Sequence, residues 1–225
     1  MGAGLRGTVS RHATARTGLT LPSELVLDVA GGLSAAYDEQ LQQSSNDILV
    51  AVAVPAWFGM ADRHQLATFL DPDGARQVGL VSSTLAAVYG HHGTTRRRSG
   101  SVVLCLDVRH GWSAGLVHRD GNGLAEVASW GIAPHDVAGR LDDSVVSPWL
   151  VDHLFEAASA VIDSTSIDAV LVIDDVGLRA SCIRDAVRQS AHPLARCQVV
   201  VGEGRSVAAG GASLVRRADR PPISV

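Results

Sequence analysis

The sequence predicts an α/β fold, and three observations indicate it. Short apolar runs rich in β-branched residues recur along the chain; the clearest extends from Ile48 to Val54 and is stopped by Pro55. Such a run is typical of a strand buried on both faces of a sheet. Segments with helical periodicity alternate with these runs. Hydrophobic residues make up 46% of the 225 residues and aromatic residues only 4%, which suits closely packed helices and strands.

The first half of the chain predicts alternating helices and strands after a polar arm. Residues 1–19 are rich in Gly, Thr and Arg without a clear period, so we expect a poorly ordered arm. A helix start follows at Thr20, with Pro22 and Glu24 in its first turn, and apolar residues then share one face as far as Gln42. The elements predicted next are a strand at 48–54, a helix at 62–70, a strand at 78–81 and a helix at 84–91.

The second half predicts a β-meander followed by a second α/β segment. Asp120-Gly121-Asn122-Gly123 is a strong hairpin turn between two β-rich runs. Beyond the meander, amphipathic helices alternate with short buried strands. The predicted elements are strands at 101–107, 112–119 and 124–130, a helix at 148–163, a strand at 167–173, a helix at 179–190, a strand at 197–201 and a helix at 204–217.

These two similar halves predict two lobes joined by a loop near 93–100. The expected division is an arm at 1–19, a truncated first α/β lobe at 20–95, a second lobe with the meander at 96–217 and a tail at 218–225.

Composition excludes several classes of function. The formal net charge of −4 gives no general attraction to nucleic acid, and all 19 basic residues are arginine, so mechanisms that need a lysine are excluded. The cysteines, Cys105, Cys182 and Cys197, lack the spacing of metal ligands. No apolar run approaches the roughly 20 residues of a membrane helix, and no apolar segment follows the first arginines. We therefore expect a cytoplasmic protein that contacts neither membrane nor nucleic acid.

Five motifs occur in an order that resembles one family of nucleotide-binding proteins. They are Val54-Pro55-Ala56-Trp57-Phe58 with Ala61 and Arg63, Thr84-Leu85-Ala86-Ala87-Val88-Tyr89-Gly90, Asp107 at the opening of the meander, Ile167-Asp168-Ala169-Val170-Leu171-Val172, and Ser206-Val207-Ala208-Ala209-Gly210-Gly211-Ala212. Together they resemble the nucleotide-binding domain of the Hsp70 chaperones, in the actin/Hsp70/sugar-kinase superfamily, over roughly residues 20–215. The resemblance implies two actin/Hsp70-like lobes and a site for ATP and magnesium.

The chain departs from that family in its architecture. The family begins with a D-L-G-T-T hairpin that holds phosphate and metal, and nothing like it precedes the helix at Thr20. The outer lobe with the catalytic lysine, which would follow that hairpin, is absent. The segment between the meander and the last α/β unit is also too short for the second outer lobe. We expect the inner subdomains to be retained and the outer subdomains to be missing.

The nucleotide motifs depart as well. The family's phosphate loop D-L-G-G-G-T corresponds to Asp107-Val108-Arg109-His110-Gly111-Trp112, so Arg109 and His110 stand where glycines would let backbone N–H groups approach phosphate. The adenosine-binding G-G-S corresponds to Asp174-Asp175-Val176, whose two carboxylates would repel phosphate.

Two more family carboxylates are missing, because Ser82 stands where the resemblance implies a glutamate beside the Thr84 motif, and Ala114 where it implies an aspartate. We therefore expect a degenerate, non-hydrolysing relative that acts as a protein-binding scaffold or adaptor, with no catalytic residue, no metal and no cofactor. No substrate-binding domain follows the helix that ends near Arg217, so we do not expect it to hold clients as a chaperone does.

The alternative is a minimal switch or weak ATPase that binds Mg-ATP or ADP. Its nucleotide-binding residues would be Asp107, Arg109, His110, Gly111, Asp174, Asp175, Gly202 and Gly204. Asp107 would hold a magnesium-bound water and Arg109 would bind phosphate. The plainer interpretations are a turn-capping carboxylate at 107, a remodelled surface turn at 109 and 110, and a solvated loop at 174 and 175. A third interpretation is an unrelated α/β enzyme whose resemblance is architectural only.

Other polar groups carry no comparable signal. Arg96-Arg97-Arg98 is one short basic run in an acidic chain, and we interpret it as a solvated loop. The histidines have no zinc-site spacing.

The missing hairpin predicts a partner. Without it, the strand from Ile48 to Val54 loses neighbours and leaves an apolar sheet edge that would aggregate unless covered. We expect residues 1–19, a partner protein or a second copy of the chain in a homodimer to cover that edge.

Overall fold

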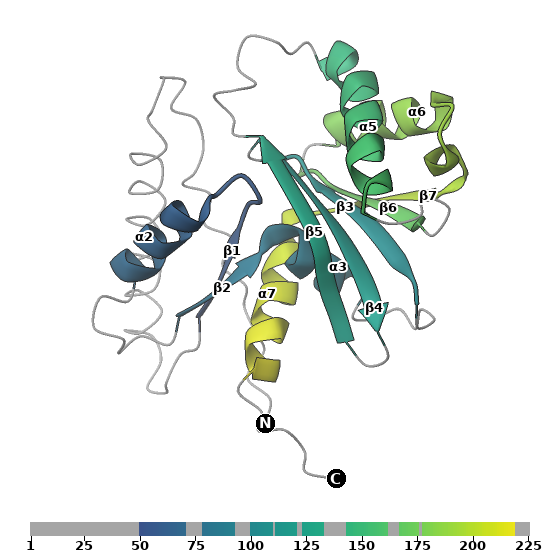
Figure 1. Ribbon diagram of the computed structural model, residues 1–225. Helices are drawn as coiled ribbons and strands as arrows, with labels where there is room; N and C mark the ends of the chain where they lie inside the picture. Colours follow the sequence, from purple (N-terminus) through teal and green to yellow (C-terminus); the bar gives the residue numbers. More distant parts are fainter. Residues whose placement is uncertain are drawn as a thin grey trace.

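The computed structural model describes residues 50–70, 78–92, 100–109, 111–120, 123–132, 143–161, 167–175 and 177–218. These residues form an α/β fold with one two-stranded and one five-stranded sheet (Figure 1). The expected arm, the helix at 20–42, and most of the loop at 93–100 and of the tail lie outside the described residues.

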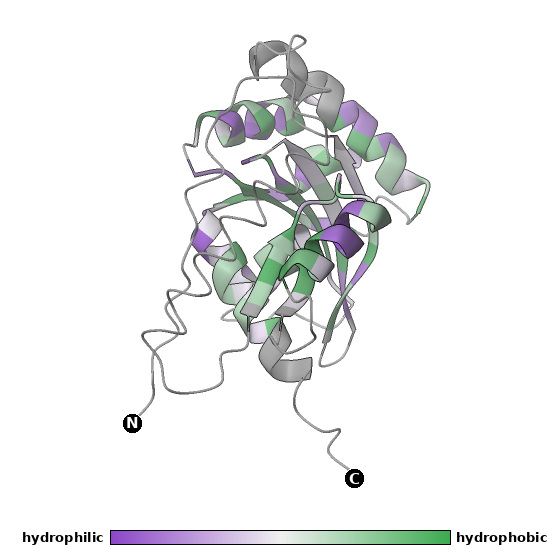
Figure 2. Ribbon diagram, turned by 90° about the vertical axis from the view of Figure 1, so that its left-hand side faces the viewer, coloured by the Kyte–Doolittle hydropathy of each residue, from purple (hydrophilic) through white to green (hydrophobic). Residues whose placement is uncertain are grey.

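The smaller sheet pairs β1 (Val50–Val54) in parallel with β2 (Val78–Ser82). Helix α2 (Met60–Leu70) covers one face, where Leu66 and Leu70 pack against Val52 and Val54. Each leucine buried in this way contributes about 1.5–3 kcal/mol to stability. Figure 2 shows hydrophobic residues along β1 and β2 and hydrophilic turns on α2. In the part of the chain that is described, β1 pairs with no strand except β2.

The larger sheet has the order β5-β4-β3-β6-β7. Its strands are β3 (Val102–Asp107), β4 (Trp112–Asp120), β5 (Gly123–Ile132), β6 (Ile167–Ile173) and β7 (Gln198–Gly202). The first three form an antiparallel meander, as expected, and β3, β6 and β7 run parallel. Every residue of β3 is buried because this strand lies in the middle of the sheet with helices on both faces.

Helices cover both faces of this sheet (Figure 1). On one face lie α5 (Asp143–Ser159), α6 (Leu178–Gln189) and the short 3₁₀ helix η3 (Pro193–Arg196), and on the other lie α3 (Ser83–His92) and α7 (Gly204–Ala218). The period-2 alternation of β3 divides its side chains between the two cores: Leu104 and Leu106 face α5 and α6, whereas Val103 and Cys105 face α3 and α7.

Helices α3 and α7 lie between the two sheets. They touch through backbone: a β-carbon on Gly90 of α3 would stand 1.8 Å from the Ser206 carbonyl oxygen of α7. Helix α7 also packs on β1, where a β-carbon on Gly211 would be 3.5 Å from that of Ala51. The layers are therefore α2, the small sheet, α3 with α7, the large sheet, and α5 with α6. A helix from the predicted second lobe thus packs directly against the first.

Two elements differ from expectation. Helix α5 begins at Asp143, so Pro148 lies in its second turn and not at its start. The 3₁₀ helix η3 was not expected; it begins at Pro193, whose fixed φ suits a first helical position. Within the described residues no helix is long and apolar enough to cross a membrane.

Candidate functional site

The carboxyl ends of β3, β6 and β7 meet at one edge of the large sheet. The register pairs Asp107 with Ile173 and Ile173 with Gly202, so the residues after these three positions lie side by side. Ligands of open α/β sheets bind outside this edge, where loops and helix N-termini gather. Six of the eight nucleotide-binding candidates come together here: Asp107, Arg109, Asp174, Asp175, Gly202 and Gly204.

Asp107 and Arg109 form a bidentate ion pair. The guanidinium donates from Nε to Oδ1 at 2.8 Å and from Nη2 to Oδ2 at 2.9 Å. The side chains are only 11% exposed for Arg109 and 7% for Asp107, so solvent screens the pair little. Burial alone would lower the pKa of Arg109, but the hydrogen bonds and charge of Asp107 and the charge of Asp175 outweigh it and raise that pKa. The guanidinium is therefore a permanent cation at the strand ends.

The same guanidinium reaches the start of α7. A β-carbon on Gly204 would stand 2.5 Å from Nη1 of Arg109 and 3.0 Å from Oδ1 of Asp175. Only glycine fits this position without displacing one of these groups. Arg109 thus fills the space in front of the N-terminus of α7, where an anion would otherwise meet free N–H groups.

The two aspartates after β6 bind different helices. Because successive strand residues point to opposite faces, Asp174 faces α6 and Asp175 faces α7. Oδ2 of Asp174 accepts the Ala180 N–H at 2.9 Å, and Oδ1 of Asp175 accepts the Gly204 N–H at 2.7 Å. Each carboxylate therefore stabilises the positive end of a helix on its own side of the sheet.

Backbone bonds tie the three strand ends together. The Val108 N–H donates to the Ile173 carbonyl, and the Asp174 N–H to the Gly202 carbonyl, each at 3.1 Å. Nη1 of Arg179 donates to the Val108 carbonyl at 2.8 Å. The turn after β3 is thus held to β6, β7 and α6.

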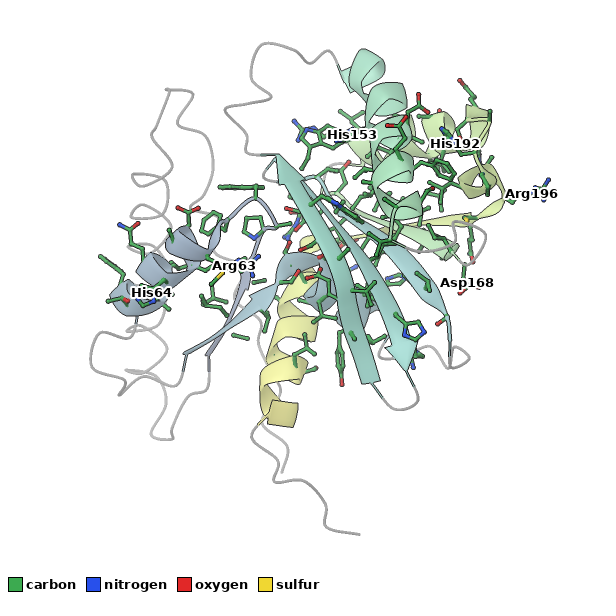
Figure 3. All side chains as sticks on the ribbon, viewed as in Figure 1. Arg63, His64, His153, Asp168, His192 and Arg196 are labelled. Carbon is green, nitrogen blue, oxygen red and sulfur yellow. The ribbon has the colours of Figure 1, made fainter. Side chains whose placement is uncertain are left out.

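The other candidates are placed differently. Gly111 has a φ of 90°, a left-handed conformation that favours glycine, and it precedes β4. His110 and the run of arginines at 96–98 lie outside the described residues. Asp168 is the second residue of β6 and so lies at the opposite end of this strand from Asp174, while His153 and His192 belong to the α5–α6 layer (Figure 3).

Sequence reasoning missed two polar groups. Arg179 supports the turn after β3 through the carbonyl of Val108. Glu126, on β5, accepts hydrogen bonds from Thr84 and from Ser82, the residue that stands where the resemblance implies a glutamate. A single acidic residue in the apolar second strand of a hairpin was the available signal. Among the residues described, no group of three or more His, Cys, Asp or Glu side chains could hold a metal ion.

Comparison with the models of known protein families and with curated proteins gives no match to the chain.

Proposed function

We propose that the chain is a degenerate Hsp70-like protein, with two inner actin/Hsp70-like lobes, that acts as a non-hydrolysing scaffold or adaptor. The observation that carries the proposal is the Asp107–Arg109 pair in the turn that corresponds to the phosphate loop. Its guanidinium faces Gly204, at the helix start where phosphate would be expected. The charged side chains at this edge are paired with one another or with helix N–H groups.

Magnesium and nucleotide fit these residues poorly. Both oxygens of Asp107 already accept from Arg109, so a magnesium-bound water would have to compete with a permanent cation. The N–H of Gly204 already donates to Asp175, so the helix start offers less to a phosphate. Asp174 and Asp175 bring two more negative charges to the same edge, which disfavours a polyphosphate.

Calorimetric titration with ATP and ADP, with and without magnesium, tests the proposal. We expect no heat from the unaltered protein at millimolar nucleotide. Binding tighter than about 100 μM, which corresponds to about −5.5 kcal/mol, would overturn it in favour of the minimal switch. In that case the charge reversal Arg109→Glu should alter the affinity, whereas Arg188→Glu, at an exposed position in the last turn of α6, should not.

The scaffold interpretation also predicts a covered edge on the small sheet, near the run from Ile48 to Val54. Sedimentation over a range of protein concentrations, with and without residues 1–19, distinguishes a second copy of the chain from residues 1–19 as the cover. A homodimer gives a concentration-dependent mass, and an intramolecular cover gives a monomer that dimerises or aggregates once residues 1–19 are removed. A soluble monomer in both forms, with rapid amide exchange along β1 and in residues 1–19, would contradict the prediction.

A further inference from the structure

Strand β5 contains a bulge that reverses which of its side chains face each side of the sheet. Leu116 of β4 pairs with Ala128 and Val117 pairs with Glu126, so Val127 has no partner. An extra residue of this kind reverses the alternation of side chains beyond it. Ala128 therefore packs with the α5–α6 core although it is an even-numbered residue like Glu126, which faces α3.

Before the bulge, Glu126 reaches across to the small sheet. Its Oε1 accepts hydrogen bonds from Ser82 Oγ at 2.8 Å and from Thr84 Oγ1. Ser82 ends β2 and Thr84 lies in the first turn of α3, so one carboxylate binds the junction of a strand and a helix from the other sheet. Gly115 of β4 provides the space that this carboxylate occupies, because a β-carbon there would stand 2.5 Å from Oε1 of Glu126.

Beyond the bulge, the same face of the meander meets the turn after β1. A β-carbon on Gly131 would stand 2.2 Å from the Trp57 nitrogen, and Ser113 Oγ accepts the Ala56 N–H at 3.0 Å. Glu126 and Gly131 are five residues apart, and in a regular strand they would face opposite sides. The bulge at Val127 is what directs both toward the small sheet.

The two ways in which the sheets are joined differ in chemistry. At the crossing of α3 and α7, backbone atoms of Gly90 and Gly210 approach too closely for a side chain or water between them. Around Glu126 and Ser113 the sheets are joined by hydrogen bonds to two hydroxyls and one amide, which water can replace, beside the close approach of Gly131 to the Trp57 backbone. The helix crossing is therefore suited to stay in place while the two sheets move apart, whereas the hydrogen bonds are suited to break.

We propose that Glu126, with Ser82 and Thr84, is a latch that holds the meander against the β1–β2 sheet, and that its release lets the two sheets open about the α3–α7 crossing. The latch is a conformational device independent of nucleotide: it operates whether or not the edge at Asp107 binds a ligand. The experiment that tests the latch is therefore separate from the nucleotide titration that tests the scaffold proposal, and either proposal can fail without the other.

Amide hydrogen exchange of the full chain tests the latch. The Ala56 amide reports on opening directly, because its acceptor is across the gap on β4. We expect Glu126→Ala to speed exchange at Ala56 and Trp57 by at least about tenfold while leaving the amides of α6 unchanged. The matched control Glu203→Ala, which removes an exposed ion pair next to β7 at the other edge of the large sheet, should change neither.

The outcomes separate a latch from general destabilisation. If Glu126→Ala merely weakens the fold, exchange rises in α6 as much as at Ala56, and the proposal fails. It also fails if exchange at Ala56 is unchanged. A latch further requires that adding Ser82→Ala and Thr84→Val to Glu126→Ala gives no additional increase, because all three side chains act in one contact.

Discussion

Gly210 of α7 lies directly on Ala86 of α3: a β-carbon on Gly210 would stand 1.8 Å from the Ala86 carbonyl oxygen. No rotamer change can relieve such a contact, because both partners are backbone. The two helices are separated by more than 100 residues in the chain, yet nothing larger than a hydrogen atom fits between them at this point.

The first prediction follows from that contact. Gly210→Leu should push α3 and α7 apart and lower the free energy of unfolding by about 3 kcal/mol, as expected for overpacking. Urea denaturation measures it. The control is Ala209→Leu, on the exposed side of the same helix, which should change stability by less than about 0.5 kcal/mol. Equal losses in the two variants would show that the crossing is not as close as described.

The second prediction concerns the ion pair at the strand ends. Arg109→Ala leaves the carboxylate of Asp107 buried without its cation and should cost about 3–5 kcal/mol of stability. The double variant Asp107→Leu/Arg109→Met removes both charges and should recover most of that loss. Arg205→Ala, in an exposed pair, should cost at most about 1 kcal/mol. If Arg109→Ala is as mild as Arg205→Ala, the pair is not buried.

The third prediction concerns the cap on α7. Asp175→Ala removes the acceptor of the Gly204 N–H and should lower stability by about 1 kcal/mol. Asp175→Asn retains an acceptor oxygen and should lower it less. The amide exchange of Gly204, followed by NMR, should rise in the alanine variant only. Faster exchange in both variants would show that the charge of Asp175, and not its hydrogen bond, protects the helix start.

The fourth prediction concerns pH. Burial, and then the charges of Asp107 and Glu126, raise the pKa of the Cys105 thiol well above its ordinary value. As pH rises, the Cys105 thiol therefore keeps its proton in the folded state at pH values at which the unfolded state has lost it. Stability from this thiol is fully present below about pH 8.5 and declines as pH rises above it.

Comparison with Cys105→Ala measures that decline. The difference in unfolding free energy between the unaltered protein and the variant should shrink steadily from about pH 8.5 upward, since alanine has no proton to lose. Cys182→Ala, at a half-buried position on α6, controls for the loss of one sulfur atom. A difference independent of pH as far as pH 10 would contradict the prediction.

The sequence predicted the strands because their patterns are local. The runs that became β3 and β6 are nearly continuous apolar segments, and the Asp120–Gly123 turn identified the hairpin between β4 and β5. The gathering of Asp107, Asp174 and Gly202 was also predictable, since the carboxyl ends of neighbouring parallel strands must meet.

The remaining features depend on residues far apart in the chain. That Arg109 binds the carboxylate two residues before it, and not a ligand, depends on the space left by Gly204 nearly a hundred residues later. The role of Glu126 depends on a bulge, which no single strand pattern reveals. The Gly90–Gly210 contact pairs two helices that each look ordinary alone.

The position of α7 between the two sheets has a consequence for synthesis on the ribosome. Chains emerge from their N-terminus, so β1, β2 and α3 leave the exit tunnel long before Gly204 is translated. Until then the inner face of the small sheet, with Ala51 and Val81, has no α7 to cover it. The nascent chain therefore carries exposed apolar surface until α7 has been made, and a message truncated before the codon for Gly204 would yield an aggregation-prone fragment and not a smaller domain.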